Sequence, residues 1–137
     1  MNTVIMITHP GIGDALRAAA LATLKSLPCD VIAINCPQDA DTQKITDKVL
    51  AMIESRSNDE GLIIFSDVFG ATPHNTAQTV ANNVKQKTHL ISGINLPMLM
   101  RTLNYIDLSL DEVCEKAIKG GAKGICDCHN PQEHPAS

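Results

Sequence analysis

The chain has 137 residues, of which 44% are hydrophobic, and this length predicts one domain with a core of its own. Its formal net charge of −4, together with two phenylalanines, one tyrosine and no tryptophan, argues against nucleic-acid binding. No apolar run approaches the roughly 20 residues of a membrane span, and the N-terminus lacks the basic region of a signal peptide, so we expect a cytoplasmic protein.

Short apolar runs alternate with helical patterns along the chain. Strands are predicted at Val4–Ile7, Val31–Ile34, Gly61–Ser66 and Thr88–Ser92. Helices are predicted from Asp14 to Lys25, from Asp41 onward, from Thr72 to Val84, after Pro97, and over Asp111–Lys119. Each strand is apolar throughout, which is typical of a parallel sheet covered on both faces. The fold class is therefore α/β, a small doubly wound sheet of four parallel strands in the flavodoxin-like order.

The ends of the chain carry weaker signals. Lys123–Cys128 is predicted as a short final strand after Gly120-Gly121. Ser57–Glu60 is polar and predicts a turn. Residues 130–137 are polar with two prolines and are expected to be disordered, so the domain is expected to span residues 1–129.

A histidine stands where the first strand stops. His9 is followed by Pro10-Gly11, and a helical pattern begins at Asp14, its expected N-cap. Loop amides and a helix N-terminus favour an anion, so a phosphoryl group on this imidazole would meet hydrogen-bond donors. The alternative is a surface loop histidine without a function.

Asp67 ends the third strand in the same way. In the flavodoxin-like order the first and third strands are neighbours, so His9 and Asp67 are expected to meet. A carboxylate that accepts the N–H of one imidazole nitrogen leaves the other nitrogen as a nucleophile. The alternative is a turn aspartate that binds its own backbone.

The segment GATPHN (70–75) opens the third helix. Thr72 is its expected N-cap and Pro73 its first helical residue. A capping hydroxyl can also hold a phosphate oxygen at a helix start. His74 is expected to be solvated, or to support the site from behind, rather than to act as the nucleophile.

Cofactor signals are weak. Cys126, Cys128 and His129, with His134 beyond, lack the second pair of a typical zinc site, so no metal is expected. The odd count of five cysteines indicates reduced thiols that mostly fill the core. Neither the nucleotide-binding motif G-x-x-x-x-G-K-[ST] nor the dinucleotide-binding motif G-x-G-x-x-G is present, so no cofactor is expected.

Three blocks of the sequence resemble the enzyme IIA component of the mannose family of the bacterial sugar phosphotransferase system. The blocks are Thr8-His9, IIFSDVFGATPHN (63–75) and ISGINLPML (91–99), and the likeness covers roughly Thr3–Lys123. The middle block is the most specific of the three. One departure is Pro10, because the family usually has glycine after the histidine and proline lacks an amide donor.

The resemblance implies a role for each matching residue. His9 would accept a phosphoryl group from the phosphocarrier HPr and pass it to a separate IIB protein, with Asp67 as its partner. Thr72 would lie near the phosphoryl group, and the backbone around Gly11, Gly70 and Ala71 would bind it. Partner docking would involve the third block, through Asn95, Pro97 and Met98, although the methionine is most simply a core or interface residue.

The resemblance also implies a homodimer in which Lys123–Cys128 is exchanged between subunits. It further implies a protein that is at most peripheral to a membrane permease. Three other functions stay open. One is a regulatory module whose phosphorylation state is a signal without sugar transport. Another is the phosphotransfer subunit of a dihydroxyacetone kinase. The third is a metal-binding domain that uses Cys126 and Cys128.

Overall fold

The structure is a computed structural model in which residues 1–56 and 61–130 are described. The strands are β1 (Thr3–Thr8), β2 (Val31–Asn35), β3 (Leu62–Ser66) and β4 (Thr88–Ser92). The helices are α1 (Ile12–Leu24), α2 (Thr42–Ser55), α3 (Thr72–Asn83), α4 (Leu96–Asn104) and α5 (Leu110–Lys123). The alternation predicted from the sequence is confirmed. The turn predicted over Ser57–Glu60 and the tail after residue 130 lie outside the described residues.

The four strands form one parallel sheet in the order β2-β1-β3-β4. This is the predicted flavodoxin-like order. In the register between β1 and β3, Ile7 lies opposite Ser66. The residues that follow these two strands therefore leave the sheet side by side at its carboxyl edge.

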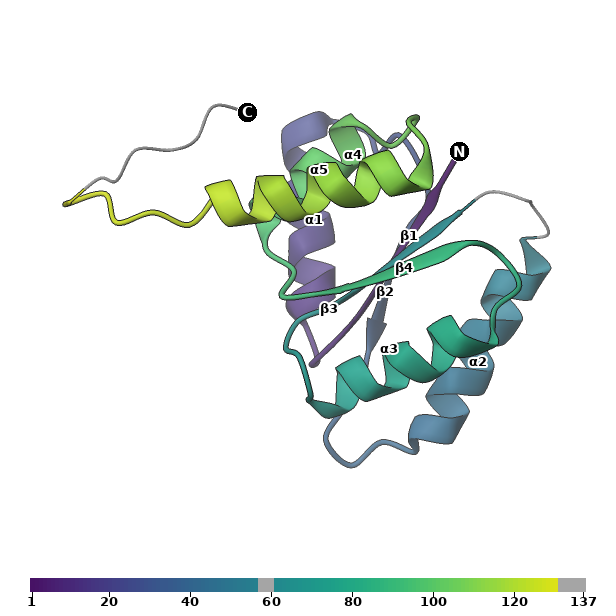
Figure 1. The fold of residues 1–137 in the computed structure, drawn as a ribbon. Helices are drawn as coiled ribbons and strands as arrows, with labels where there is room; N and C mark the ends of the chain where they lie inside the picture. Colours follow the sequence, from purple (N-terminus) through teal and green to yellow (C-terminus); the bar gives the residue numbers. More distant parts are fainter. Residues whose placement is uncertain (57–60, 131–137) are drawn as a thin grey trace.

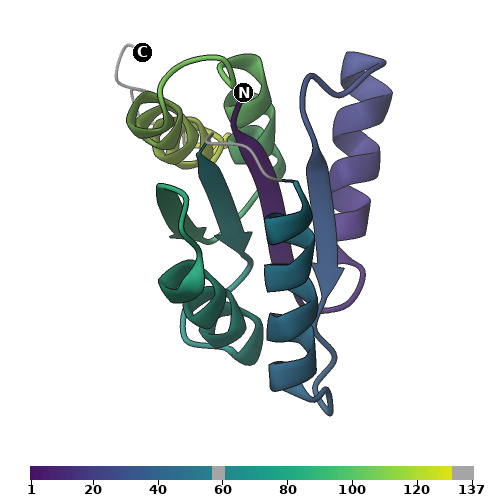
Figure 2. The ribbon, with the colours of Figure 1, turned by 90° about the vertical axis from the view of Figure 1, so that its right-hand side faces the viewer.

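Helices cover both faces of the sheet. Figures 1 and 2 show α1, α4 and α5 on one face and α2 and α3 on the other. Alternate residues of β1 serve the two layers, since Val4 and Met6 pack toward the first group and Ile5 and Ile7 toward the second. The two central strands, β1 and β3, are buried along their whole length, which explains why they are mostly apolar, whereas β2 and the edge strand β4 are partly exposed.

Two helix starts differ from the prediction. α1 begins before Asp14, because Gly11 takes a left-handed conformation (φ 88°) and turns the chain into the helix at once. Asp14 therefore lies in the first turn, where its carboxylate accepts a hydrogen bond from Asn35 Nδ2 at 3.0 Å. Ala71 is the N-cap of α3, so Thr72 is its first helical residue and not its cap. The cap predicted at Asp41 is confirmed.

The predicted start of a last strand at Lys123 is wrong, because α5 continues through this residue. Gly120-Gly121 does not end the helix but lets it approach α4 closely. A Cβ added at Gly121 would lie 2.6 Å from Met98 Cε, and one at Gly120 would lie 2.6 Å from Arg101 Cβ. The following residues, 125–127, form neither helix nor strand in this chain.

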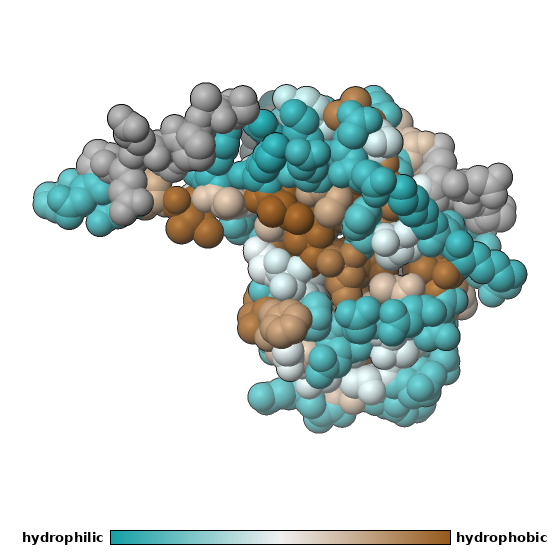
Figure 3. Space-filling model, in the orientation of Figure 1, coloured by the Kyte–Doolittle hydropathy of each residue, from teal (hydrophilic) through white to brown (hydrophobic). Residues whose placement is uncertain are grey.

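β4 is an edge strand with apolar surroundings. No strand pairs with its outer edge within residues 1–56 and 61–130. Figure 3 shows apolar residues gathered between α5 and α3, on the side where β4 faces the viewer in Figure 1. Several large apolar residues near these elements are exposed: Phe69 (79%), Ile125 (73%), Val68 (53%) and Ile118 (51%). In the described part of the chain no helix combines the length and the apolar character needed to cross a membrane.

Candidate functional site

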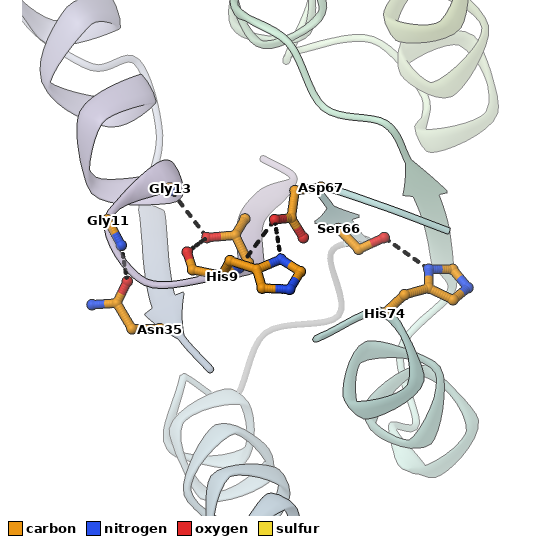
Figure 4. A network of polar contacts seen from close by, with 8 residues as sticks. His9, Gly11, Gly13, Asn35, Ser66, Asp67 and His74 are labelled. Atoms are coloured by element: carbon orange, nitrogen blue, oxygen red, sulfur yellow. Dashed lines mark hydrogen bonds and ion pairs between the residues drawn. The ribbon is translucent and has the colours of Figure 1, made fainter. Parts of the chain in front are cut away.

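His9 and Asp67 meet at the carboxyl edge of the sheet, as predicted. His9 Nδ1 lies 2.6 Å from Asp67 Oδ2, and the same oxygen accepts the backbone N–H of His9 at 3.1 Å (Figure 4). One carboxylate oxygen therefore fixes both the ring and the backbone of the histidine. The parallel pairing of β1 with β3 positions the two residues, since each follows the last residue of its strand.

The two side chains differ in exposure. The Asp67 side chain is 6% exposed, whereas that of His9 is 40% exposed. Donation from Nδ1–H to the carboxylate leaves the lone pair on Nε2. No described residue forms a hydrogen bond with this nitrogen. The arrangement presents a nucleophilic nitrogen to an incoming molecule.

Asp67 is held in its charged form. Burial opposes its ionisation, but the hydrogen bonds from the ring and the backbone amide of His9 outweigh burial, so the pKa of Asp67 lies below its ordinary value. Its second oxygen, Oδ1, is buried without a hydrogen-bond partner in the described part of the chain. The carboxylate is therefore available at neutral pH to orient the imidazole.

The lowered pKa predicts how stability depends on pH. The charged Asp67 stabilises the folded state. This stabilisation is fully present above the pKa that Asp67 has in the unfolded chain, and it is lost as the pH falls through the lower pKa of Asp67 in the folded state. We expect Asp67→Asn to be less stable than the wild type at neutral pH and the two to converge in acid. Urea unfolding across a pH series measures this. The exposed Asp39→Asn variant is the control and should follow the wild type; equal pH slopes for Asp67→Asn and the wild type would contradict the prediction.

Side chains at the ends of β1 and β2 accept hydrogen bonds from backbone amides in and after the His9 loop. The buried Thr8 hydroxyl donates to the His9 carbonyl at 2.8 Å and accepts the amide of Gly13 at 3.1 Å. The amide of Gly11 donates to Asn35 Oδ1 at 3.0 Å. A phosphoryl-binding role for Gly11 would therefore require Asn35 to release this amide. Thr8 and Asn35 were not predicted as site residues, although both end strands at this edge.

The backbone amides at the start of α3 have fewer hydrogen-bond partners than those at the start of α1. Its N-cap, Ala71, makes no side-chain hydrogen bond to the helix, and the Ala71 amide reaches the Val68 carbonyl only at 3.4 Å. Gly70 turns the chain here with φ 83°. Because first-turn amides without a side-chain cap can bind an anion, this terminus suits a phosphoryl group better than that of α1.

Thr72 lines a groove between α2 and α3. The groove has a volume of about 290 Å³. Its lining is polar and comes from Thr42, Gln43, Thr46, Thr72, Asn75, Thr76 and Thr79. The exposed Thr72 hydroxyl makes no hydrogen bond within the described residues. It is therefore free to bind a ligand oxygen.

His74 supports the site from behind and is not solvated. It is 8% exposed, and its Nδ1 lies 2.7 Å from the hydroxyl of Ser66 (Figure 4). The ring also packs against Phe69, with 5.0 Å between the ring centroids. Because Ser66 directly precedes Asp67, this contact ties the first turn of α3 to the end of β3. Because its ring is buried, His74 is poorly placed to accept a phosphoryl group from a donor as large as a protein.

The contact between Ser66 and His74 predicts a loss of stability. Ser66→Ala leaves His74 Nδ1 buried without a partner, which costs about 1–2 kcal/mol. The double variant Ser66→Ala/His74→Phe removes both polar groups and should recover part of the loss. Urea unfolding of the wild type, the two single variants and the double variant measures the coupling. Additive effects of the two substitutions would show that the contact contributes nothing.

The third block of the family resemblance, residues 91–99, holds α4 to α5. Asn95 caps α4 by accepting the Met98 amide at 2.9 Å and donates from Nδ2 to the Gly121 carbonyl at 3.2 Å. Met98 is 6% exposed and packs in the core, whereas Pro97 is exposed. The docking role of Asn95 and Pro97 stays a prediction, and Met98 is a core residue in this structure.

The cysteines near the C-terminal end lie apart from this site. Cys126 and Cys128 are exposed free thiols. In residues 1–56 and 61–130, no three histidine, cysteine or acidic side chains come together as metal ligands. His134 lies outside the described residues.

Comparisons with known proteins identify the family of this chain. A family model described as "PTS system fructose IIA component" (EIIA-man) matches residues 3–118. The mannose-specific EIIAB component of the PTS system of Escherichia coli strain K12 is 28% identical over 87 residues; the match covers 62% of this chain and 27% of that protein. The chain thus corresponds to about a quarter of this relative.

Solved structures share the fold. The mannose/sorbose-specific IIA subunit of Enterococcus faecalis has a TM-score of 0.80 at 18% identity, covering 97% of this chain and 98% of that one. A sigma-54 interaction domain protein of the same species has a TM-score of 0.69 at 12% identity, covering 85% and 86%. At these identities the likeness establishes the fold alone.

Proposed function

This chain belongs to the family of PTS system fructose IIA components (EIIA-man), and on that premise we propose that it is a phosphohistidine relay protein whose carrier is His9. Its mannose-family membership makes it a component of a sugar phosphotransferase system. The observation that carries the proposal is the 2.6 Å contact between His9 Nδ1 and Asp67 Oδ2, which leaves Nε2 open to a partner. Residues 1–129 would form the phosphotransfer domain.

The transfer is an in-line displacement at phosphorus. The Nε2 lone pair of His9 attacks the phosphorus of a donor phosphohistidine, the new N–P bond forms, and the N–P bond of the donor breaks. The donor imidazole leaves with its electron pair. Asp67 keeps Nδ1 protonated and stabilises the positive charge that develops on the His9 ring. No metal or nucleotide takes part, because the donor bond is already activated.

The incoming phosphoryl oxygens need donors. The start of α3 supplies backbone amides from the turn at Gly70 and Ala71, and the Thr72 hydroxyl lies in its first turn. The partial positive charge of the helix N-terminus adds to these donors. Positioning and charge stabilisation are the main contributions that a protein makes to phosphoryl transfer.

The rim of the site suits protein partners. Val68 and Phe69 follow Asp67 directly and are 53% and 79% exposed, and Ile12 follows the His9 loop. An apolar rim around an exposed imidazole fits docking of another protein better than capture of a free sugar. We assign HPr as the donor and a separate IIB protein as the acceptor.

A homodimer with an exchanged C-terminal segment is part of the proposal. The outer edge of β4 is unpaired in the described chain, and exposed Ile118 and Ile125 lie on α5 and just after it. An unpaired apolar edge favours the addition of a strand. The occupant we propose is Ile125–Cys128 of a second copy.

Charging by phosphorylated HPr tests the relay. The full chain, incubated with phosphorylated HPr, should gain the mass of one phosphoryl group, and a mannose-family IIB domain added next should remove it. No gain in intact mass would overturn the proposed function. Charging without discharge to IIB would favour the regulatory module or the dihydroxyacetone kinase subunit.

A further inference from the structure

Two exposed thiols lie in contact just after α5. Cys126 Sγ and Cys128 Sγ are 3.3 Å apart, and both residues are exposed. The segment leaves the body of the protein beyond Gly124, which abuts Pro97 so closely that an added Cβ would lie 2.5 Å from Pro97 Cγ (Figure 1). The dithiol therefore sits on a segment anchored at one end and open to small reagents.

A local turn holds the chain in a bent form there. The Asp127 carboxylate accepts the backbone amides of His129 at 3.0 Å and Asn130 at 3.1 Å. Such turns bend the chain away from an extended conformation. The bend is consistent with the approach of the two thiols that flank Asp127.

The other three cysteines are less reactive by position. Cys36 is 1% exposed, and burial, together with the nearby Asp30 and Asp107 charges, raises the pKa of Cys29 to about 11. Burial also raises the pKa of Cys114. Because the thiolate is the reactive form, these side chains are protected from thiol–disulfide exchange. Selective chemistry therefore falls on the exposed pair.

We propose that Cys126 and Cys128 form a dithiol that low-molecular-weight disulfides oxidise reversibly, and that the oxidised form withholds Ile125–Cys128 from exchange between subunits. The second part rests on the strand exchange proposed above. The first part stands on the contact and exposure of the two thiols alone.

The oxidation proceeds by two exchange steps. The Cys128 thiolate attacks one sulfur of glutathione disulfide, whose S–S bond breaks and releases one glutathione. Cys126 then loses its proton to solvent, attacks Cys128 Sγ and releases the second glutathione. Two cysteine thiols are oxidised and one glutathione disulfide is reduced to two thiols. This order agrees with the raised pKa of Cys126, whose thiol is hydrogen-bonded to Cys128 and would be repelled by a thiolate there.

A disulfide at this spacing excludes a strand. In an extended strand residues i and i+2 point to the same side and are about 6.6 Å apart. A disulfide needs its Cβ atoms about 3.5–4.5 Å apart. Ile125–Cys128 can therefore be an exchanged strand or a disulfide-closed turn, but not both. Reduction would permit the exchange and oxidation would prevent it.

The test uses the full chain, reduced and then incubated with glutathione disulfide. Intact mass should show that the wild type loses two hydrogens and retains no glutathione. Cys126→Ser and Cys128→Ser should each retain one glutathione as a stable mixed disulfide, because the second thiol is missing. Cys29→Ser is the matched control and should behave as the wild type. A wild type that stays reduced or retains glutathione would overturn the dithiol.

Sedimentation of the same samples tests the consequence. The reduced wild type should be a dimer, and oxidation should weaken the dimer by at least about tenfold in its dissociation constant. The double variant Cys126→Ser/Cys128→Ser should dimerise equally well with and without the oxidant. Formation of the disulfide without a change in the dimer would overturn the coupling. A reduced wild type that is monomeric would overturn the exchange and its redox control together, while the mass result still decides whether the dithiol forms.

Discussion

Replacing His9 with asparagine abolishes charging by phosphorylated HPr while the fold persists. The asparagine Nδ2 can replace ring Nδ1 as the donor to Asp67 Oδ2, so the contact that now measures 2.6 Å keeps a partner. The variant has no atom in place of Nε2, and so no nucleophile. We expect complete loss of the phosphoryl adduct in intact-mass spectra, with the urea midpoint close to that of the wild type.

A second histidine–aspartate pair provides the control. His89 Nε2 lies 2.7 Å from Oδ1 of the exposed Asp111. His89 is the second residue of β4 and therefore lies toward the amino end of its strand, away from the carboxyl edge of the sheet. His89→Asn should charge at the wild-type rate. A phosphoryl adduct that persists in His9→Asn would move the acceptor to another residue, and peptide mapping would then identify it.

Replacing Asp67 with asparagine slows charging by about 100- to 1000-fold. The variant amide can donate to Nδ1, which places the proton on Nε2 and removes the lone pair that attacks phosphorus. It also removes the negative charge that stabilises the phosphorylated ring. Docking surfaces are unchanged, so the affinity for HPr should change by no more than about twofold. Rapid-quench charging at saturating phosphorylated HPr measures the rate.

Asp111→Asn is the matched control for this substitution, because it removes a carboxylate that binds a histidine elsewhere. It should leave the charging rate unchanged. If Asp67→Asn charged as fast as the wild type, the carboxylate would not orient the nucleophile, and the 2.6 Å contact would have only a structural role.

The sequence predicts the sheet and the central pair well for a physical reason. Strands buried on both faces must be apolar throughout, so Val4–Ile7 and Gly61–Ser66 stand out in the sequence. Once β1 and β3 are neighbours, parallel pairing alone brings the residues after them together, which is why His9 and Asp67 were expected to meet.

What the sequence did not predict depends on contacts between distant residues. Gly120-Gly121 has the composition of a helix end, yet here it marks the close approach of α5 to α4, which only the packing against Met98 and Arg101 reveals. Similarly, Asn35 binds the amide of Gly11 from another strand, so the expected phosphate donor is occupied. A local sequence pattern cannot distinguish a free backbone amide from one whose hydrogen-bond partner is distant in the sequence.

The support of the site by Ser66 and His74 was foreseen only in part. The sequence predicts that His74 is either solvated or lies behind the site. The residue is only 8% exposed, so it lies behind the site and is not solvated. In the sequence its partner, Ser66, is simply the last residue of a predicted apolar strand. A polar residue at the end of a buried strand, eight positions before a histidine, was the available signal.

The position of the phosphoryl group on the imidazole tests the central claim most directly. The protein, labelled with ¹⁵N at histidine and charged by phosphorylated HPr, can be examined by proton–nitrogen correlation NMR. Because Asp67 Oδ2 holds Nδ1, we predict a phosphoryl group on Nε2 of His9 alone. A phosphoryl group on Nδ1, or on a residue other than His9, would contradict the account.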